Sequence, residues 1–270
     1  MKITKISTQK KKGRYNIFVD KGQGEEFGFG VDEDILIEFH LQKGMELDSN
    51  LLKTLEQKNE VHQVFSLAIN FLSYRMRTIQ EMVQYLRKKE VEQDQIDQVI
   101  NRLKSEGYLN DAEFAASFVA TRKNTSGKGP ILIKKELMDK GVEASIIENS
   151  LTLYSREEQL EKAMKLIEKK IAVEKRKSHQ QAVQTVKQTL LQKGFTQDII
   201  QEGLQNIELN KDSDEEWNAI VYQGEKAVAK YQRKYEGFEL KQKVKTSLYQ
   251  KGFTFDEIER FLDTIQKEMG

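Results

Sequence analysis

The feature that most constrains the fold of this 270-residue chain is a short signature, Leu-x-x-Lys-Gly followed by an apolar residue. Complete copies begin at Leu137, Leu190 and Leu248, and an altered copy begins at Leu86, with Glu90 in the glycine slot. A glycine just past the last helical residue can adopt the left-handed conformation that closes a helix, and a lysine beside it complements the negative helix end. The glycine slots lie 51 to 58 residues apart, so the signature predicts tandem repeats of three short helices each.

The apolar positions after each signature keep the same phase, which indicates that the four copies share one local structure. Six positions past the glycine slot the chain has isoleucine in every copy: Ile96, Ile147, Ile200 and Ile258. Two middle helices also carry start signals, because Thr78-x-x-Glu81 forms a capping box and Pro130 suits the first position of a helix. We therefore predict a mainly α fold in which four three-helix repeats stack into an elongated, curved array.

Composition favours a long helical protein that acts by binding a partner. Pro130 is the only proline, and helix interiors exclude proline. The absence of cysteine excludes a disulfide framework and is compatible with a reducing cytosol. The net charge is only +1, from 44 basic and 43 acidic residues, whereas a dedicated duplex-DNA binder is usually clearly basic. No apolar run is long enough for a signal peptide or a membrane span, so we expect a cytoplasmic protein without membrane contact.

Residues 1–60 differ in pattern from the rest of the chain. Apolar residues alternate or cluster around Ile3 and over residues 15–19 and 25–31, which predicts a hairpin and a further strand. The segment 31–41 fits either a helix or a strand. The first helix of the first repeat is expected at about residues 61–74. We predict five parts: a β-rich N-terminal module with a linking helix over 1–60, and helical repeats over 61–109, 110–155, 156–210 and 211–270.

The sequence offers no constellation for catalysis or metal binding. The three histidines, His40, His62 and His179, lie far apart, and none has an acidic or histidine neighbour at metal-ligand spacing. Gly127-Lys128-Gly129 is similar to part of a phosphate-binding loop, but Arg122 stands where the first glycine of that loop is required. We therefore expect no enzyme activity, cofactor, metal or small-molecule substrate.

Two stretches resemble the RecX family of recombinase regulators. One runs from Gly107 to Arg122 with the sequence Gly-Tyr-Leu-Asn-Asp-Ala-Glu-Phe-Ala-Ala-Ser-Phe-Val-Ala-Thr-Arg and continues over residues 128–141; the other spans residues 68–78. The first stretch closely resembles that family's Gly-Tyr-[Leu/Ile]-[Asn/Asp]-Asp core. The resemblance covers residues 61–270, and the N-terminal extension is similar to that of the longer Gram-positive members.

The resemblance implies a function that the spacing alone does not give. RecX-type proteins bind the RecA recombinase and its filament on single-stranded DNA, and they restrain filament growth, ATP hydrolysis, strand exchange and the coprotease activity behind the SOS response. The family fold of tandem three-helix repeats agrees with the repeats found independently. The resemblance therefore implies the RecA filament as partner; we also expect weak contact with single-stranded DNA and a monomeric protein.

The candidate contact residues are basic and lie at the same inter-helix corner of the first two repeats. They are Arg75, Arg77, Arg122, Lys123, Lys128, Lys134 and Lys135. Together they could form a stripe facing the filament or its DNA phosphates. Alternatively, they cap helix C-termini and pair with nearby acids. Two other functions stay open: direct nucleic-acid binding by helix-turn-helix-like units, and a helical-repeat scaffold for another protein.

Overall fold

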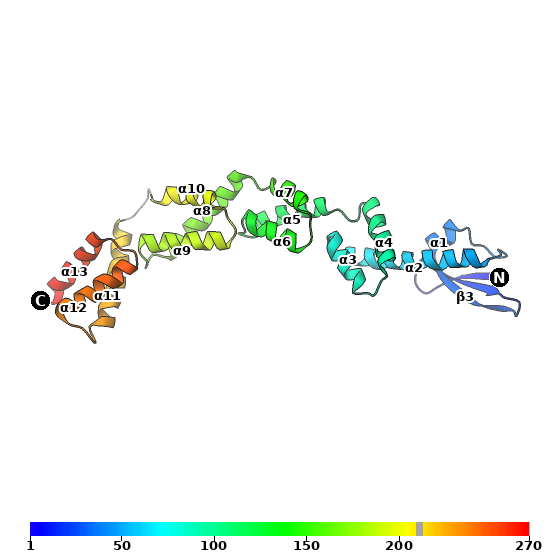
Figure 1. The fold of residues 1–270 in the computed structure, drawn as a ribbon, viewed down its shortest axis with the longest axis horizontal. Helices are drawn as coiled ribbons and strands as arrows, with labels where there is room; N and C mark the ends of the chain where they lie inside the picture. Colours follow the sequence, from blue (N-terminus) through cyan, green and yellow to red (C-terminus); the bar gives the residue numbers. More distant parts are fainter. Residues whose placement is uncertain (209–212, 270) are drawn as a thin grey trace. The chain divides into compact units, whose positions relative to one another are not determined.

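The computed structural model describes residues 1–208 and 213–269 of the chain (Figure 1). In sequence order, a small antiparallel sheet is followed by helices, so the predicted mainly α fold with a β-rich N-terminal module is confirmed. The chain divides into two compact units, the first made of Met1–Phe114 and Lys140–Val142, the second of Ala115–Asp139 and Glu143–Gly270.

The first unit begins with a three-stranded antiparallel sheet in the order β1-β2-β3. Its strands are β1 (Lys2–Thr8), β2 (Arg14–Asp20) and β3 (Glu25–Asp32), and the short helix α1 (Glu33–Glu38) follows directly. Alternate residues of a strand point to the same face, and accordingly Ile17 and Val19 of β2 are fully buried, together with Ile3 and Ile35. The predicted hairpin and third strand are confirmed. Residues 31–41, which fit either a helix or a strand in the sequence, contain the end of β3 and all of α1.

Helices occupy most of the remaining described residues and fall into groups of three. The first group is α2 (Ser49–Leu72), α3 (Ile79–Arg87) and α4 (Gln93–Ser105), and the second is α5 (Asp111–Thr125), α6 (Pro130–Asp139) and α7 (Ala144–Leu151). The third is α8 (Arg156–Val173), α9 (His179–Gln192) and α10 (Gln197–Glu208), and the fourth is α11 (Ser213–Tyr231), α12 (Gly237–Gln250) and α13 (Phe255–Met269).

The first long helix, α2, begins earlier than the helix predicted at about residues 61–74. The Asp48 side chain accepts a hydrogen bond of 2.7 Å from the backbone N–H of Leu51 and so caps a helix that starts at Ser49. Helix α2 therefore passes through the predicted boundary between residues 60 and 61. The predicted boundary between the third and fourth repeats, at residues 210 and 211, lies outside the described residues.

The predicted apolar register and the two helix starts are confirmed. The four aligned isoleucines, Ile96, Ile147, Ile200 and Ile258, are all fully buried. Thr78 and Glu81 form a capping box at the start of α3, and Pro130 is the first residue of α6. Shared phase in the sequence thus corresponds to a shared core position in each three-helix group.

The glycine slot closes the middle helix in every copy of the signature. Gly141, Gly194 and Gly252 all have positive φ, between +76° and +85°. Glu90 also has φ of +60°, and the next residue, Val91, donates its backbone N–H to the carbonyl of Leu86 at 3.3 Å. The altered copy therefore ends its helix in the same conformation, although a side chain in the left-handed region costs about 1–2 kcal/mol.

Each complete signature also contacts the start of the preceding middle helix. In the first unit, the Thr78 hydroxyl donates to the carbonyl oxygen of Lys140 at 2.7 Å. In the second unit, Gly129 donates its backbone N–H to the carbonyl oxygen of Lys193 at 2.7 Å. The Ser178 hydroxyl likewise donates to the carbonyl oxygen of Lys251. We call these three contacts the joints, and each satisfies a carbonyl group that the end of a helix leaves unpaired.

The joints explain why glycine fills three of the four slots. A Cβ on Gly194 would lie 2.6 Å from the backbone nitrogen of Leu132, and one on Gly252 would lie 2.9 Å from Oε1 of Gln180. The first copy has no three-helix group before it, and Glu90 is exposed. The slot at Glu90 therefore has room for a side chain, and only the backbone conformation is strained.

Candidate partner-binding surface

Arg75, the first of the predicted contact residues, is paired with Glu81 of α3. Its Nη2 and Nη1 donate to Oε1 and Oε2 of Glu81 at 3.1 and 3.2 Å. The Lys140 ammonium donates to the same carboxylate at 2.8 Å, across the first joint. Burial opposes ionisation of Glu81, but the hydrogen bonds from Arg75, Lys140 and the backbone of Thr78 outweigh it and lower the pKa from 4.5 to about 2. Glu81 is thus the centre of a charge cluster that binds two cations.

Arg77 lies on an aromatic stack instead of projecting into solvent. Its guanidinium carbon is 4.0 Å from the ring centroid of Phe71, which stacks on Tyr85 with centroids 3.9 Å apart and rings tilted by 4°. The Lys89 ammonium lies 5.9 Å from the Tyr85 centroid. Burial lowers the pKa of Arg77, and the positive charge of Arg75 acts in the same direction. This cation–π arrangement stabilises the pairing of α2 with α3.

Three predicted residues of the second repeat pair with carboxylates inside the second unit. Arg122 Nε lies 2.8 Å from Oε2 of Glu136, and Lys128 forms an ion pair with the same carboxylate. The Lys123 ammonium donates to both oxygens of Glu158, at 2.7 and 2.9 Å. The Arg122–Glu136 and Lys123–Glu158 pairs join different helices, and Lys128 lies in the segment between α5 and α6. The pairs therefore position helix ends as well as carrying charge.

The last two predicted residues, on α6, differ from each other. Lys134 forms an ion pair with Glu148 of α7. Lys135 is exposed and forms no ion pair with a described residue. Five of the seven predicted residues thus have a carboxylate partner within the chain, and one lies on an aromatic ring. Lys135 is the one of the seven that has neither contact among the described residues. Contact of any of the seven with a partner stays a prediction.

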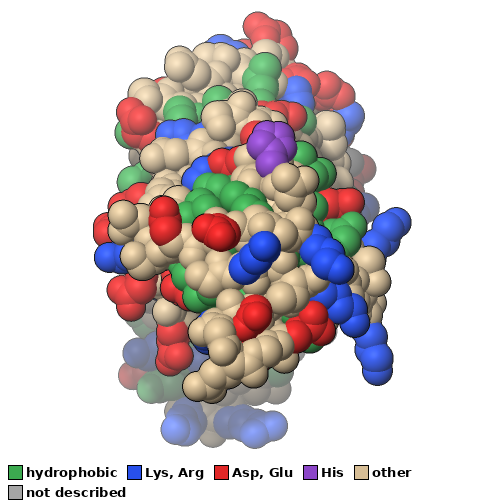
Figure 2. Space-filling view, turned by 90° about the vertical axis from the view of Figure 1, so that its right-hand side faces the viewer, with side chains coloured by type: hydrophobic (Ala, Val, Ile, Leu, Met, Phe, Trp, Pro, Cys, Tyr) green, Lys and Arg blue, Asp and Glu red, His purple; other side chains and the backbone are tan. Residues whose placement is uncertain are grey.

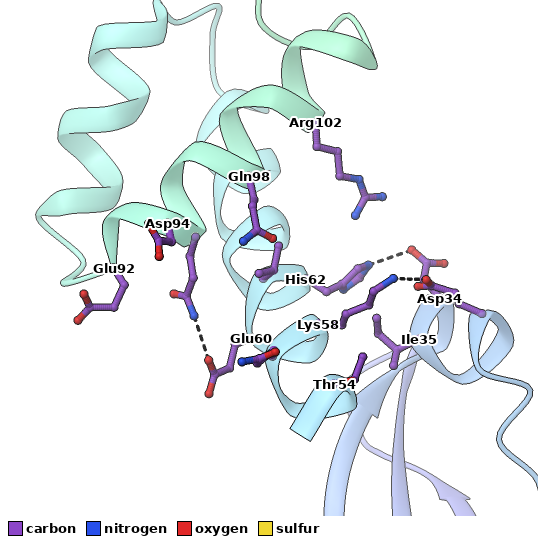
Figure 3. Close-up of a pocket in the computed structure, with 14 residues that line it drawn as sticks. Asp34, Ile35, Thr54, Lys58, Glu60, His62, Glu92, Asp94, Gln98 and Arg102 are labelled. Atoms are coloured by element: carbon purple, nitrogen blue, oxygen red, sulfur yellow. Dashed lines mark hydrogen bonds and ion pairs between the residues drawn. The ribbon is translucent and has the colours of Figure 1, made fainter. Parts of the chain in front are cut away.

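The N-terminal module and the first helical group enclose a cleft of about 830 Å³ between α1, α2 and α4 (Figure 3). His62 of α2 lies on its wall, with Nε2 2.9 Å from Oδ2 of Asp34 and Nδ1 3.1 Å from Oδ2 of Asp32. Lys58 forms an ion pair with Glu38 on the same wall. Contrary to the expectation from sequence spacing, His62 therefore has two acidic neighbours. They belong to the module, and the contacts attach it to α2.

The surface around the module carries both signs of charge. Figure 2 shows Lys and Arg side chains interspersed with Asp and Glu over this face, with several basic side chains at one edge. Among the described residues, no group of three His, Asp or Glu side chains is placed to hold a metal ion. No described helix has the length and apolar character needed to cross a membrane.

Sequence reasoning missed the acidic partners and the aromatic stack. A local signal existed for Glu158, because Ser155-x-x-Glu158 is a capping box like Thr78-x-x-Glu81, and both boxes supply the glutamate that binds a predicted basic residue. No local signal existed for Glu136 as the partner of Arg122, or for the stacking of Phe71 on Tyr85.

The fold and this surface define a class: a protein of tandem three-helix groups whose charged corners are tied together by ion pairs, with a small sheet at the N-terminal end of the chain. Comparison with known proteins gives the family. The RecX N-terminal domain matches residues 1–48, and the first and second RecX three-helix domains match residues 65–103 and 110–151. The third RecX three-helix domain matches twice, over 157–204 and 214–262. The chain belongs to the RecX family of regulatory proteins.

Individual relatives agree with the family match over nearly the whole chain. The chain is 48% identical to the regulatory protein RecX of Oceanobacillus iheyensis over 270 residues, covering 99% of each chain. It is 45% identical to that of Bacillus cytotoxicus over 96% of each chain. A crystal structure of a regulatory protein RecX matches with a TM-score of 0.66 and 34% identity, covering 74% of this chain and 97% of the other. The crystal structure of RecX from Lactobacillus salivarius matches with a TM-score of 0.55 and 37% identity, covering 56% of this chain and 99% of the other.

Proposed function

We propose that this protein is a negative modulator of the RecA recombinase. It binds the RecA filament on single-stranded DNA and restrains filament assembly, ATP hydrolysis, strand exchange and the coprotease activity of the SOS response. It acts in the cytoplasm as a monomer, by binding and not by catalysis, and needs no cofactor. Membership of the RecX family supports this proposal, because these are the activities that the family resemblance implies.

The observation that carries the proposal is the recurrence of the joints. Within the second unit, the start of α6 binds the signature at Lys193 and the start of α9 binds the signature at Lys251. Because the same kind of joint occurs twice in succession, corresponding helix surfaces recur along this unit. A filament is itself a repeating partner, so several weak contacts of one kind can add up to tight binding without any single strong site.

The ion pairs decide which predicted residues are available to the filament. A partner that binds Arg75, Arg122, Lys123, Lys128 or Lys134 must compete with a carboxylate already in place. Exposed ion pairs are each worth about 1 kcal/mol or less, so a strongly acidic filament surface can open them. Lys135 needs no such exchange, and we propose that it makes the first contact.

Filament imaging tests the proposal. Cognate RecA is assembled on single-stranded DNA with ATP, and its filament length and strand-exchange yield are measured with and without an excess of this protein. We expect shorter filaments and a lower yield, with ATP hydrolysis reduced in parallel. Unchanged length, yield and hydrolysis would sink the proposal.

An accessory contact with single-stranded DNA forms part of the same proposal. The near-neutral charge and the internal pairing of most candidate cations favour weak binding over a dedicated DNA-binding function. We expect binding to single-stranded DNA without RecA to be weak and to fall only shallowly with added salt. A steep salt dependence would instead favour direct nucleic-acid binding, and capture of a protein other than RecA from lysate would favour the scaffold alternative.

A further inference from the structure

The third helical group has an apolar groove on its surface between α8 and α9. The groove has a volume of about 330 Å³ and lies within the second unit. Its apolar lining consists of Leu166 and Val173 from α8 with Val186 and Leu190 from α9, of which Val186 and Leu190 are buried and form the floor. The residues that α8 contributes are spaced i, i+3, i+4, i+7, and those of α9 are spaced identically, so one face of each helix lines the groove over about two turns, or about 10 Å.

The rim of the groove is basic. Lys169 and Lys170 of α8 and Lys193, the C-cap of α9, line it, and no carboxylate does. None of the three lysines forms an ion pair with a described residue, in contrast to the paired cations of the second repeat. Val173, at the end of α8, leaves 73% of its surface exposed, which is unusual for an aliphatic residue beside a groove.

In the first two groups, side chains bridge the first and middle helices near the corresponding place. The residue before the signature leucine is Tyr85 in the first group, Glu136 in the second and Thr189 in the third. Tyr85 stacks on Phe71, and Glu136 pairs with Arg122. Thr189 is too short to reach across, so the third group keeps the groove open.

In the fourth group the same place is polar. Gln223 of α11 accepts a hydrogen bond from the ammonium of Lys251, the C-cap of α12. The third group has none of these bridging contacts among its described residues, and there the groove has an apolar floor and a basic rim. The packing of a three-helix group therefore does not by itself require such a groove.

We propose that this groove binds an acidic amphipathic helix of a partner protein. Helix α10 already packs against α8 and α9, so a helix lying in the groove would add a further helix to the pair. Apolar side chains one turn apart would fill the floor, as in other helix-in-groove complexes. Flanking Asp or Glu side chains would pair with Lys169, Lys170 and Lys193, which sets the charge and orientation of the bound helix. A nucleic-acid backbone would satisfy the rim but leave the apolar floor empty.

This inference rests on the proposed function, because it assigns the helix to the recombinase. The test uses full-length protein with Val173→Asp or Lys169→Glu, and matched controls Leu191→Asp and Lys187→Glu on the exposed side of α9. All four side chains are exposed, so circular dichroism should show unchanged folding. Affinity for cognate RecA filaments on single-stranded DNA should fall about tenfold in each groove variant and less than about twofold in each control.

The outcomes separate the two proposals. If wild-type protein fails to bind the filament, the proposed function fails and the groove loses its assigned partner. If wild-type protein binds and Val173→Asp binds equally well, the groove inference alone is overturned. Groove variants that lose affinity no more than their controls overturn it too.

The absence of cysteine allows a direct identification of the occupant. Val173→Cys carries a single thiol, which takes a benzophenone crosslinker, with Leu191→Cys as control. After irradiation on the RecA filament, mass spectrometry should place the Val173→Cys crosslink on one recombinase segment with acidic residues beside regularly spaced apolar ones. A crosslink to DNA alone, to a second copy of this chain, or equally from both positions would contradict the inference.

Discussion

At the scale of single residues, the glycine slot can impose two requirements, a left-handed backbone and the absence of a side chain. Different residues of this chain meet one or both of them. Gly194 needs a left-handed backbone and also a bare Cα, because Leu132 of the preceding middle helix lies against it. Glu90 meets only the first requirement, and Gly237 has φ of +52° with open space around it. The cost of adding a side chain should therefore depend on the neighbour as well as on φ.

Substituting these glycines by alanine tests that separation. Gly237→Ala should cost only the backbone term, about 1–2 kcal/mol. Gly194→Ala should cost clearly more, since its Cβ would lie 2.6 Å from a backbone nitrogen that has little freedom to move. Urea unfolding followed by the fluorescence of Trp217, the only tryptophan and a residue of the second unit, measures both. Equal losses for the two variants would contradict the close approach at the joint.

Glu81 gives a pH dependence whose sign follows from its pKa. The folded pKa of about 2 lies below the ordinary value of 4.5, so the ionised carboxylate stabilises the fold above pH 4.5 and this stabilisation is lost as the pH falls toward 2. Because the side chain is partly exposed, we expect a loss of about 1–2 kcal/mol. The difference in unfolding free energy between wild type and Glu81→Gln should shrink by that amount between pH 5 and pH 2.

Circular dichroism of urea unfolding at each pH measures this difference. Glu161→Gln is the matched control, because Glu161 pairs with a single exposed lysine on its own helix. A difference between wild type and Glu81→Gln that stays constant over the acid range would show that Arg75 and Lys140 do not hold the carboxylate ionised.

At the scale of helices, N-cap residues divide into those that act within one helix and those that also form a joint. Ser155 accepts a hydrogen bond from the backbone of Glu158 and caps α8 alone. Ser178 caps α9 in the same way but is fully buried and donates to Lys251 as well. The two serines look alike in the sequence and differ in the number of helices that depend on them.

Alanine at the two caps should therefore have unequal effects. Ser155→Ala should cost about 1 kcal/mol, the usual value for a lost N-cap. Ser178→Ala should cost about 2–3 kcal/mol, because it also leaves the partly buried carbonyl group of Lys251 without its donor. Trp217 fluorescence during urea unfolding reports both variants in the same unit. If both lost the same amount, the hydroxyl of Ser178 would contribute nothing to the joint.

At the scale of the whole molecule, ion pairs occupy most of the predicted contact residues, namely Arg75, Arg122, Lys123, Lys128 and Lys134. Of the seven predicted contact residues, Lys135 is the one with neither an ion pair nor a cation–π contact among the described residues, and Lys187 is an exposed lysine on the corresponding helix of the next group. Replacing either lysine by glutamate should change the free energy of unfolding by no more than about 0.5 kcal/mol. Their effects on filament binding should differ, because we propose contact for Lys135 alone.

Lys135→Glu should weaken binding to RecA filaments a few-fold, mainly by slowing association, and Lys187→Glu should leave it unchanged. A rim charge acts chiefly on the rate of encounter and on its salt dependence. Stopped-flow measurements at low and high salt separate the two variants. Equal association rates at low salt would remove Lys135 from the contact surface.

The sequence by itself determined the local architecture. Four features were predictable because each depends on residues within a few positions of one another. They are the helix ends at the signature, the capping box at Thr78, the helix start at Pro130 and the shared isoleucine phase. Even Glu90 obeys the local rule, since its helix ends as the others do. The family resemblance rested on the same kind of short-range pattern.

Only the tertiary structure decided which other parts of the chain those helices contact. Glu81 meets Lys140 across 59 residues and Lys123 meets Glu158 across 35, separations at which no sequence periodicity specifies a partner. The sequence predicts that the signature ends a helix, and the structure shows that in the complete copies it is also one half of a joint. Which cations are paired, and which groove stays open, depends on side chains from different helices meeting in space, a property that local propensity does not encode.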